Sequence, residues 1–314
     1  MGFNLKGRSL LTLKDVTAEE IRHLLEISHQ VKRERRAGVV SQRFLGKTLA
    51  LIFEKRSTRT RCAFETAFGE EGGYPVFLSI DDIQLGSKES VEDTARVLGR
   101  MFDAIQFRGF KQSTVEALAT HSGVPVYNGL TDLYHPTQVL ADLQTVEESF
   151  GRLKGIRMVY AGDGRNNMAN TLMIGCAKMG LHYTIAAPQA LWPEDALVAE
   201  CNAIIREERT GGSVAVTDSM AEAVKGAHVL YTDVWASMGE ESQKAQREAM
   251  LRAYQVNDAV MDATGNVDAI FMHCLPAVKG QEVTAELLDG PRSKAWDEAE
   301  NRKHTIKALM LATI

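Results

Sequence analysis

The chain has 314 residues, a length that favours two domains of ordinary size over one. Its net charge of -5 excludes the basic footprint of a nucleic-acid-binding protein, and its apolar runs are too short to span a membrane. The four cysteines are far apart and form no CxxC pair, which argues against a disulfide framework or a structural zinc site. The same cysteine usage favours a reducing cytoplasm, and the N-terminal residues lack the pattern of a secretion signal, so we expect a cytoplasmic protein.

The first half of the chain alternates between apolar runs and segments of helical periodicity. A capping box at residues 17–20 predicts the start of the first helix, because apolar residues then recur at helical spacing. Strands and helices alternate from there to residue 149, which implies right-handed crossovers and a mostly parallel sheet. The predicted strands are 48–53, 74–79, 104–107 and 124–127, and the helices that follow them end near 69 or cover 90–101, 113–121 and 137–149.

The glycine-flanked stretch 151–155 is a plausible domain break, because the same alternation begins again after it. We therefore predict an α/β protein of two doubly wound domains, each with a mainly parallel sheet flanked by helices. Residues 1–150 and 151–296 form these domains, and a C-terminal helix at 297–314 crosses back to the first. The predicted strands of the second domain are 156–161, 182–187, 214–216, 228–234 and 270–274, with helices at 167–179, 195–208 and 219–225.

Hydroxyl and guanidinium side chains fill residues 57–61, where the strand 48–53 gives way to a helix. The unpaired N–H groups and positive dipole of a helix N-terminus favour anions there. Arginine adds bidentate donors that match phosphate oxygens. A solvated basic turn with Ser57 or Thr58 as the N-cap is the plainer alternative. The density of anion-binding side chains favours a phosphate site.

Other polar residues follow further strands of the first half. Arg108 comes directly after the strand 104–107, although a surface charge would fit there equally well. His135 and Gln138 frame a His-Pro-Thr-Gln segment whose proline suits the first turn of a helix. His135 can donate to a developing oxyanion, or it can merely cap that helix. Because ligands of open α/β sheets bind beyond the carboxyl ends of the strands, we expect these residues on one rim.

The second half begins with a glycine pattern that resembles a dinucleotide-binding fingerprint. Gly162 and Gly164 match its first two glycines, but Asn167 stands at the third position, where glycine permits close helix–strand packing. A nicotinamide dehydrogenase is therefore disfavoured. Asn166 and Asn167 fit better with binding a polar small molecule at a helix N-terminus.

Two later strands also end in polar residues. Asp233 could hold an ammonium group, or it could cap the next helix, and Ser237 with the following N–H could hold a carboxylate. Cys274 closes the strand 270–274. A thiol in that place fits a nucleophile, a hydrogen-bond partner or an inert apolar filler.

Taken together, these motifs resemble the transcarbamylase family. Residues 57–61 match its carbamoyl-phosphate signature, and 135–138 match its second motif. The residues 53–56, Asp233 with 237–239, and 273–276 resemble its ornithine-specific branch. The resemblance runs from residue 4 to residue 302, and the five motifs occur in the same order.

That resemblance implies carbamoyl phosphate on the first domain and L-ornithine on the second, with no metal and no organic cofactor. It implies a homotrimer or a multiple of trimers, with sites near the subunit boundaries and Gln84 donated by a neighbouring subunit. Ornithine would be held by Asn167, Asp233, Ser237 and Met238. Carbamoyl phosphate would be held by Ser57, Thr58, Arg59, Thr60, Arg61, Gln84, Arg108, His135, Gln138, Cys274, Leu275 and Arg302.

The implied reaction is attack of the ornithine δ-amine on the carbamoyl carbon, with loss of phosphate. Arg59, Arg108 and His135 would stabilise charge on oxygen, and Asp233 and Cys274 would orient the amine. In this interpretation Cys274 is a polar contact and forms no covalent intermediate. Putrescine is the alternative acceptor, although it has no carboxylate for 237–239. Aspartate would need further cations, and a non-catalytic phosphate-binding protein is the alternative from another class.

Overall fold

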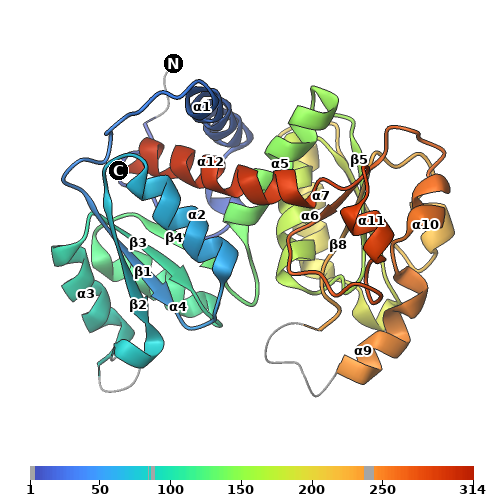
Figure 1. Ribbon diagram of the computed structural model, residues 1–314. Helices are drawn as coiled ribbons and strands as arrows, with labels where there is room; N and C mark the ends of the chain where they lie inside the picture. The colour runs from blue at the N-terminus through green and yellow to red at the C-terminus, as the bar shows by residue number, and fades with distance from the viewer. Residues whose placement is uncertain (1–3, 84, 86–88, 237–243) are drawn as a thin grey trace. The chain divides into compact units, whose positions relative to one another are not determined.

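The computed structural model describes residues 4–83, 85, 89–236 and 244–314. The chain divides into two compact units, Met1–Gln144 with Glu300–Ile314, and Thr145–Ala299. Each unit is built on a parallel β-sheet with helices on both faces (Figure 1). These observations confirm the predicted fold class. Among the described residues, no helix is both long and apolar enough to cross a membrane.

The sheet of the first unit has the strand order β2-β1-β3-β4. Phe53 pairs with Ser79 and Arg108, and Arg108 pairs with Leu130, so all four strands end at one rim. The segments that follow the strands are therefore neighbours in space. The strands are β1 (Thr48–Phe53), β2 (Tyr74–Ser79), β3 (Ala104–Arg108) and β4 (Val126–Leu130).

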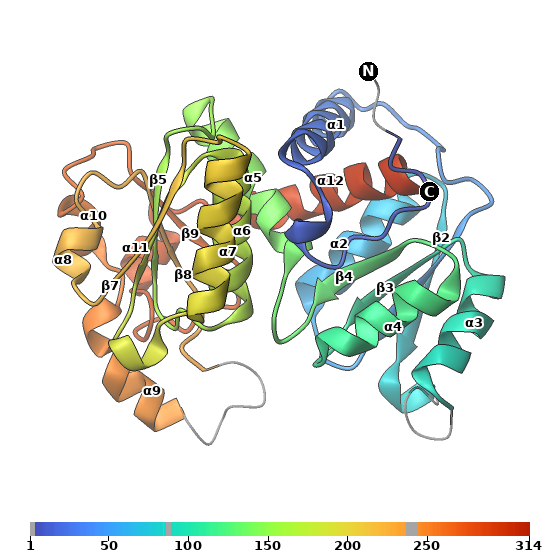
Figure 2. The same cartoon turned by 180° about the vertical axis from the view of Figure 1, so that it is seen from behind.

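Helices cover both faces of this sheet, α2 on one and α3 with α4 on the other (Figure 2). Ala50, Ile52 and Phe107 belong to the apolar cluster shared with α3 and α4. As predicted, a capping box opens α1: Thr17 Oγ1 accepts the Glu20 N–H at 3.1 Å, and Glu20 Oε2 accepts the Thr17 N–H at 2.8 Å. The helices are α1 (Ala18–Arg36), α2 (Thr58–Gly69), α3 (Val91–Met101), α4 (Gln112–Ser122), α5 (Pro136–Phe150) and α12 (Ala295–Thr313), with short 3-10 turns at Leu13–Asp15 and Ile80–Asp82.

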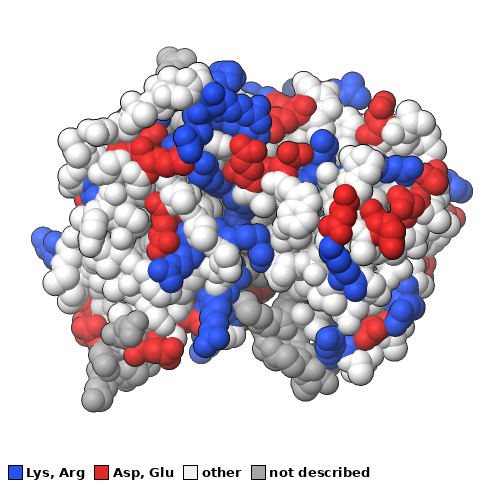
Figure 3. All heavy atoms as spheres, in the orientation of Figure 1, with Lys and Arg blue, Asp and Glu red and all other residues white. Residues whose placement is uncertain are grey.

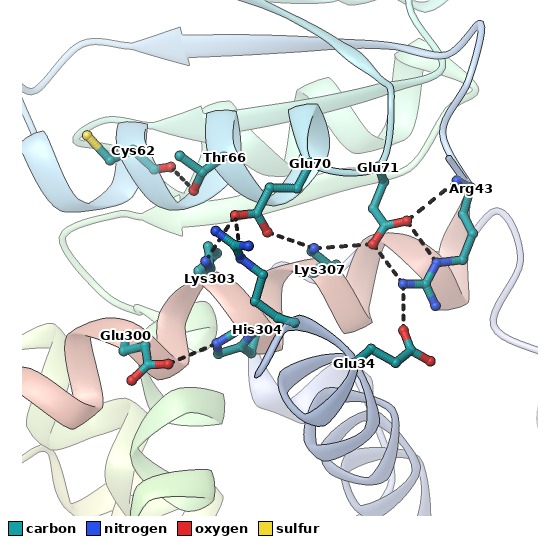
Figure 4. A network of polar contacts seen from close by, with 11 residues as sticks. Glu34, Arg43, Cys62, Thr66, Glu70, Glu71, Glu300, Lys303, His304 and Lys307 are labelled. Carbon is teal, nitrogen blue, oxygen red and sulfur yellow. Dashed lines mark hydrogen bonds and ion pairs between the residues drawn. The ribbon is translucent and has the colours of Figure 1, made fainter. Parts of the chain in front are cut away.

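Ion pairs tie α12 to the end of α2 (Figure 4). Lys303 Nζ lies 3.1 Å from Glu70 Oε1, and Lys307 Nζ lies 2.9 Å from Glu70 Oε2 and 3.2 Å from Glu71 Oε1. Arg43 Nη2 contacts the same Glu71 carboxylate at 2.7 Å. The side chains of Lys307 and Glu71 are only 4% and 3% exposed, so the buried charges compensate one another within the first unit.

The sheet of the second unit has the order β7-β6-β5-β8-β9. The chain builds outward from β5 through β6 and β7 and then returns to place β8 on the other side of β5. The carboxyl ends of β5 and β8 thus form a topological switch point, where α/β sheets bind ligands. The strands are β5 (Arg157–Ala161), β6 (His182–Ala186), β7 (Ser213–Thr217), β8 (Val229–Thr232) and β9 (Ile270–His273), and the helices are α6 (Asn167–Met179), α7 (Asp195–Glu207), α8 (Met220–Ala223), α9 (Lys244–Leu251), α10 (Asp258–Asp262) and α11 (Ala285–Asp289), with 3-10 turns at Gln189–Leu191 and Arg252–Tyr254.

Some elements differ from the sequence-based prediction. Strand β4 runs from Val126 to Leu130, whereas the predicted strand covered 124–127 and left out Asn128 and Gly129. Asn128 is fully buried, and its amide nitrogen donates to the Leu11 carbonyl at 2.9 Å, which compensates its polarity. No helix was predicted between residues 235 and 269, where α9 and α10 lie.

Candidate functional site

The N-terminus of α2 lies at the rim where the strands of the first sheet end. Ser57 caps this helix, because its Oγ accepts the Thr60 N–H at 3.1 Å. Thr58 is exposed, and Ser57 and Arg59 are half-buried. Ser57 is therefore the N-cap of α2, as the plainer alternative predicted. A ligand can still bind there, because the Ser57 hydroxyl keeps its own proton for donation.

Arg61 contacts an aromatic ring and a carboxylate of the first unit. Its guanidinium packs over the Phe77 ring at 3.8 Å, and its Nε donates to Glu65 Oε1 at 2.9 Å. Both contacts hold the side chain against the exposed side of α2. In the described structure Arg61 is thus engaged by this helix and by β2.

Thr60 is the centre of a buried cluster in the first unit. Its side-chain oxygen accepts hydrogen bonds from Arg108 Nη1 at 3.2 Å and from Arg302 Nη2 at 3.1 Å. Arg302, on α12, also donates through Nη1 to Gln138 Oε1 at 2.9 Å. Gln138 in turn donates through Nε2 to Asp142 Oδ1 at 2.8 Å, which fixes the orientation of its amide. Two guanidiniums are held in defined positions by uncharged acceptors.

His135 adjoins this cluster and is only 4% exposed. Burial, followed by the charges of Arg302, Arg108 and Arg59, holds the pKa of His135 well below its usual range. The imidazole is therefore neutral at physiological pH and can donate one N–H without adding charge. The structure thus brings together Arg59, Thr60, Arg108, His135, Gln138 and Arg302, which were predicted from four segments of the sequence.

Lys and Arg side chains gather in one region of the surface of the first unit. In Figure 3 a band of Lys and Arg atoms runs over the first unit across α1 and α2, with acidic side chains beside it. Since the net charge of the chain is -5, this band does not reflect the overall composition. Local positive charge of this kind suits a small anion.

A second polar group lies at the switch point between β5 and β8. Asp233 is 8% exposed, and its Oδ1 accepts the Val234 N–H at 2.8 Å and the Cys274 thiol at 3.2 Å. Burial raises the pKa of Asp233, while nearby His273 and the two hydrogen bonds oppose that rise. Asn167 is the first residue of α6 and is half-buried beside Asn166, whose Oδ1 caps the helix at the Ala169 N–H.

The residues after β9 are held in an uncommon conformation. Leu275 has φ of 59°, which side chains other than glycine rarely adopt and which occurs preferentially at functional sites. His273 Nδ1 accepts the Leu275 N–H at 2.8 Å, so its Nε2 carries the proton and faces Glu282 Oε1 at 3.3 Å. Asp233, His273 and Cys274 offer potential metal-ligand atoms within 4.8 Å of one another. Both ring nitrogens of His273 are already engaged, which favours a hydrogen-bonded cluster over a metal centre.

Three predicted site residues, Gln84, Ser237 and Met238, lie outside the described residues. Sequence reasoning missed Asp142, although its position one helical turn after Gln138 was a usable signal. It also missed Glu282 and Tyr160, since nothing in the local sequence pattern relates them to His273 or Asn166.

Comparisons with known proteins cover the whole chain. Residues 8–148 match the family model described as the aspartate/ornithine carbamoyltransferase carbamoyl-P binding domain, and residues 154–313 match its Asp/Orn binding domain. Ornithine carbamoyltransferase from Caldanaerobacter subterraneus subsp. tengcongensis is 68% identical over 314 residues, with 100% of both chains covered. The protein of the same name from Thermotoga maritima is 64% identical over the same length and coverage. The solved structure of ornithine carbamoyltransferase from Pyrococcus furiosus aligns with a TM-score of 0.94 at 44% identity, covering 99% of this chain and 98% of that one.

Proposed function

The chain belongs to the aspartate/ornithine carbamoyltransferase family, and on that basis we propose that it transfers the carbamoyl group of carbamoyl phosphate to the δ-amine of L-ornithine. The products are L-citrulline and phosphate. The observation that carries the proposal is the cluster of Arg108, Arg302 and neutral His135 around Thr60. The names of the relatives support ornithine as the acceptor.

The phosphate end of the donor binds at the N-terminus of α2. The positive end of α2, with its first-turn N–H groups and the hydroxyls of Ser57 and Thr58, favours an anion there. Thr60 accepts from two guanidiniums, so its own proton remains for a ligand oxygen. Arg59 and Arg61 supply charge, and Arg61 has to exchange its Glu65 contact for the phosphate.

The carbonyl of the donor lies between Arg59, Arg108 and His135, with Gln138 on the carbamoyl nitrogen. As the amine attacks, negative charge develops on the carbonyl oxygen. Fixed donors at that oxygen stabilise the transition state more than the ground state, and removal of one such donor typically lowers kcat by about 10²–10³-fold. His135 contributes a hydrogen bond and the arginines contribute charge.

The amine of ornithine must lose a proton before it attacks, because an alkyl ammonium has a pKa near ~10. Asp233 accepts hydrogen bonds from the Val234 N–H and from the Cys274 thiol, so it acts as a carboxylate and Cys274 as a protonated donor. These groups orient the amine, Asn167, Ser237 and Met238 hold the α-substituents, and the Leu275 carbonyl contacts the carbamoyl group. The ammonium proton goes to solvent before attack. The new bond joins nitrogen to the carbamoyl carbon, the bond from that carbon to the phosphate oxygen breaks, and phosphate takes the second proton, which the attacking nitrogen loses.

We also propose that the enzyme works as a homotrimer or a multiple of trimers, in which Gln84 completes a neighbouring subunit's site. The support is the full-length similarity to the relatives. This assembly needs no nucleic acid and no membrane.

Product analysis tests the proposed acceptor. Purified protein is incubated with carbamoyl phosphate and L-ornithine, putrescine or L-aspartate, and products are identified by mass spectrometry while phosphate release is measured. We expect citrulline and an equal amount of phosphate with ornithine. Carbamoylated putrescine without citrulline would overturn the choice of acceptor. Phosphate binding without a carbamoylated product from any amine would instead favour a binding protein.

A further inference from the structure

Tyr160 contacts Asn166, whose amide also contacts Asp233, and the proposed reaction gives Tyr160 no role. It is on β5 and fully buried, and its ring stacks on that of Tyr231 with centroids 6.1 Å apart. Its hydroxyl accepts a hydrogen bond from Asn166 Nδ2 at 2.6 Å. This bond links a buried strand to the residue that caps α6.

The orientation of the Asn166 amide is fixed by both of its ends. Its Oδ1 accepts the Ala169 N–H at 2.8 Å as the helix cap, so its Nδ2 must point the other way. There the two amide protons reach Tyr160 Oη at 2.6 Å and Asp233 Oδ2 at 3.5 Å. The short bond to Tyr160 therefore determines where the second proton meets Asp233.

The two oxygens of Asp233 have different surroundings. Oδ1 accepts hydrogen bonds from the Val234 N–H and the Cys274 thiol. Oδ2 accepts a long hydrogen bond from Asn166 Nδ2, at 3.5 Å. A carboxylate oxygen has two acceptor sites, so Oδ2 keeps capacity for a donor from the ligand. This oxygen is the one suited to the acceptor amine.

We propose that Tyr160 is a positioning residue for the acceptor: its hydroxyl holds the Asn166 amide so that Asp233 Oδ2 faces the ornithine amine. The inference rests on the proposed function, because it presumes that Asp233 contacts that amine. Tyr160 touches neither substrate in this scheme and acts through Asn166. Burial, followed by the negative charge of Asp233, holds the pKa of Tyr160 well above its usual range, so its hydroxyl stays protonated.

The variant Tyr160→Phe tests this role, because it keeps the ring that stacks on Tyr231 and removes the hydroxyl. We expect the KM for ornithine to rise about tenfold while the KM for carbamoyl phosphate and kcat stay near wild type. With the amide no longer held, the Asp233 carboxylate loses a donor and its pKa rises. The acid limb of kcat/KM for ornithine therefore shifts to higher pH.

Tyr183→Phe is the matched control. Tyr183 is also fully buried, and its hydroxyl donates to the Ala169 carbonyl of the same helix α6 at 3.2 Å. We expect it to lower the melting temperature without changing the ornithine KM or the pH profile. A rise of the ornithine KM in both variants, or in neither, would overturn the inference.

Asn166→Asp gives an independent reading if Tyr160→Phe folds poorly. Aspartate keeps the oxygen that caps α6 but replaces the amide donor with a negative charge beside Asp233. We expect a larger rise of the ornithine KM and a further shift of the acid limb. An unchanged acid limb would contradict the role of this amide. Absence of citrulline with the wild-type protein would contradict the proposed function itself. Citrulline formation with unchanged variants would contradict only the role of Tyr160.

Discussion

A single hydroxyl organises the proposed donor site at the residue scale. Thr60 Oγ1 is the acceptor shared by Arg108 and Arg302, which come from β3 and α12. Hydrogen bonds from charged donors contribute more than neutral ones and fix geometry as well. One uncharged side chain therefore helps to position two cations, and Gln138 is a second uncharged acceptor for Arg302.

Thr60→Val removes that acceptor with little change of shape. The two guanidiniums lose a buried partner, so we expect kcat/KM for carbamoyl phosphate to fall about 10²-fold, measured by steady-state kinetics. Thr66→Val is the control on the same helix, because the Thr66 hydroxyl is exposed and bonds to the Cys62 carbonyl at 2.6 Å. Equal kinetics for the two variants would contradict the role of Thr60 in positioning Arg108 and Arg302.

Sequence reasoning reached these residues unevenly. The segment 57–61 predicts an anion site, because the end of the strand, the start of the helix and the side-chain types can all be read from neighbouring residues. Arg302 is 242 positions from Thr60 and was reached only through family resemblance, since no local rule relates a helix near the C-terminus to α2. Which cations point inward was also beyond prediction, because Arg61 turned out to be engaged by Glu65 and Phe77.

At the scale of elements, two sets of contacts fix α12 against α2. Arg302 meets Thr60 in the first turn of α2, and Lys303 and Lys307 meet Glu70 and Glu71 just beyond its last turn. A helix held at both ends of its partner can neither slide nor rotate freely. The ion pairs in Figure 4 thus support the placement of Arg302 as well as the stability of the first unit.

Glu71→Gln tests the strength of this attachment. Burial opposes the ionised form of Glu71, but hydrogen bonds from Arg43 and Lys307 outweigh it and lower its pKa. Glutamine keeps an acceptor oxygen but lacks the charge that Arg43 and Lys307 contact, while Glu70 still pairs with Lys307. We therefore expect the free energy of unfolding to fall by about 2 kcal/mol at neutral pH, measured by urea denaturation. A carboxyl group with a lowered folded pKa contributes its full stability above its unfolded pKa, near ~4.3, and loses it as the pH falls through the folded value. The difference between variant and wild type should therefore shrink below pH ~4.

The control for this variant is Arg96→Gln. Arg96 pairs with Asp93 on α3, but both side chains are exposed, at 59% and 62%. Surface pairs of this kind contribute roughly 0–1 kcal/mol. If Glu71→Gln proves no more destabilising than this control, the buried ion pairs are not what holds α12.

The alternation of strands and helices was predictable at this scale, because buried parallel strands have continuous apolar runs. The pattern of apolar residues was less informative where a polar side chain is buried in a strand and satisfied by hydrogen bonds, as Asn128 is in β4. It also failed for α10, a helix of five residues, since so short a helix shows no full period.

At the scale of the whole molecule, the two halves of the proposed chemistry belong to different units. The first unit carries the arginines and neutral His135, and the second carries Asp233 and Cys274. The former suit an acyl phosphate and the latter an amine. The sequence-based assignment to the transcarbamylase family is confirmed by full-length relatives, whereas the roles of individual residues remain predictions.

An isotope-transfer experiment follows the carbamoyl carbon from the donor to the ornithine nitrogen. The protein is supplied with carbamoyl phosphate labelled with ¹³C at the carbonyl and ornithine labelled with ¹⁵N at the δ-position, and the product is observed by nuclear magnetic resonance. Carbamoyl transfer to the δ-amine gives citrulline in which the two labels share a direct ¹³C–¹⁵N coupling. Release of the ¹³C label as cyanate or carbon dioxide, with the ¹⁵N label left in ornithine, would contradict it.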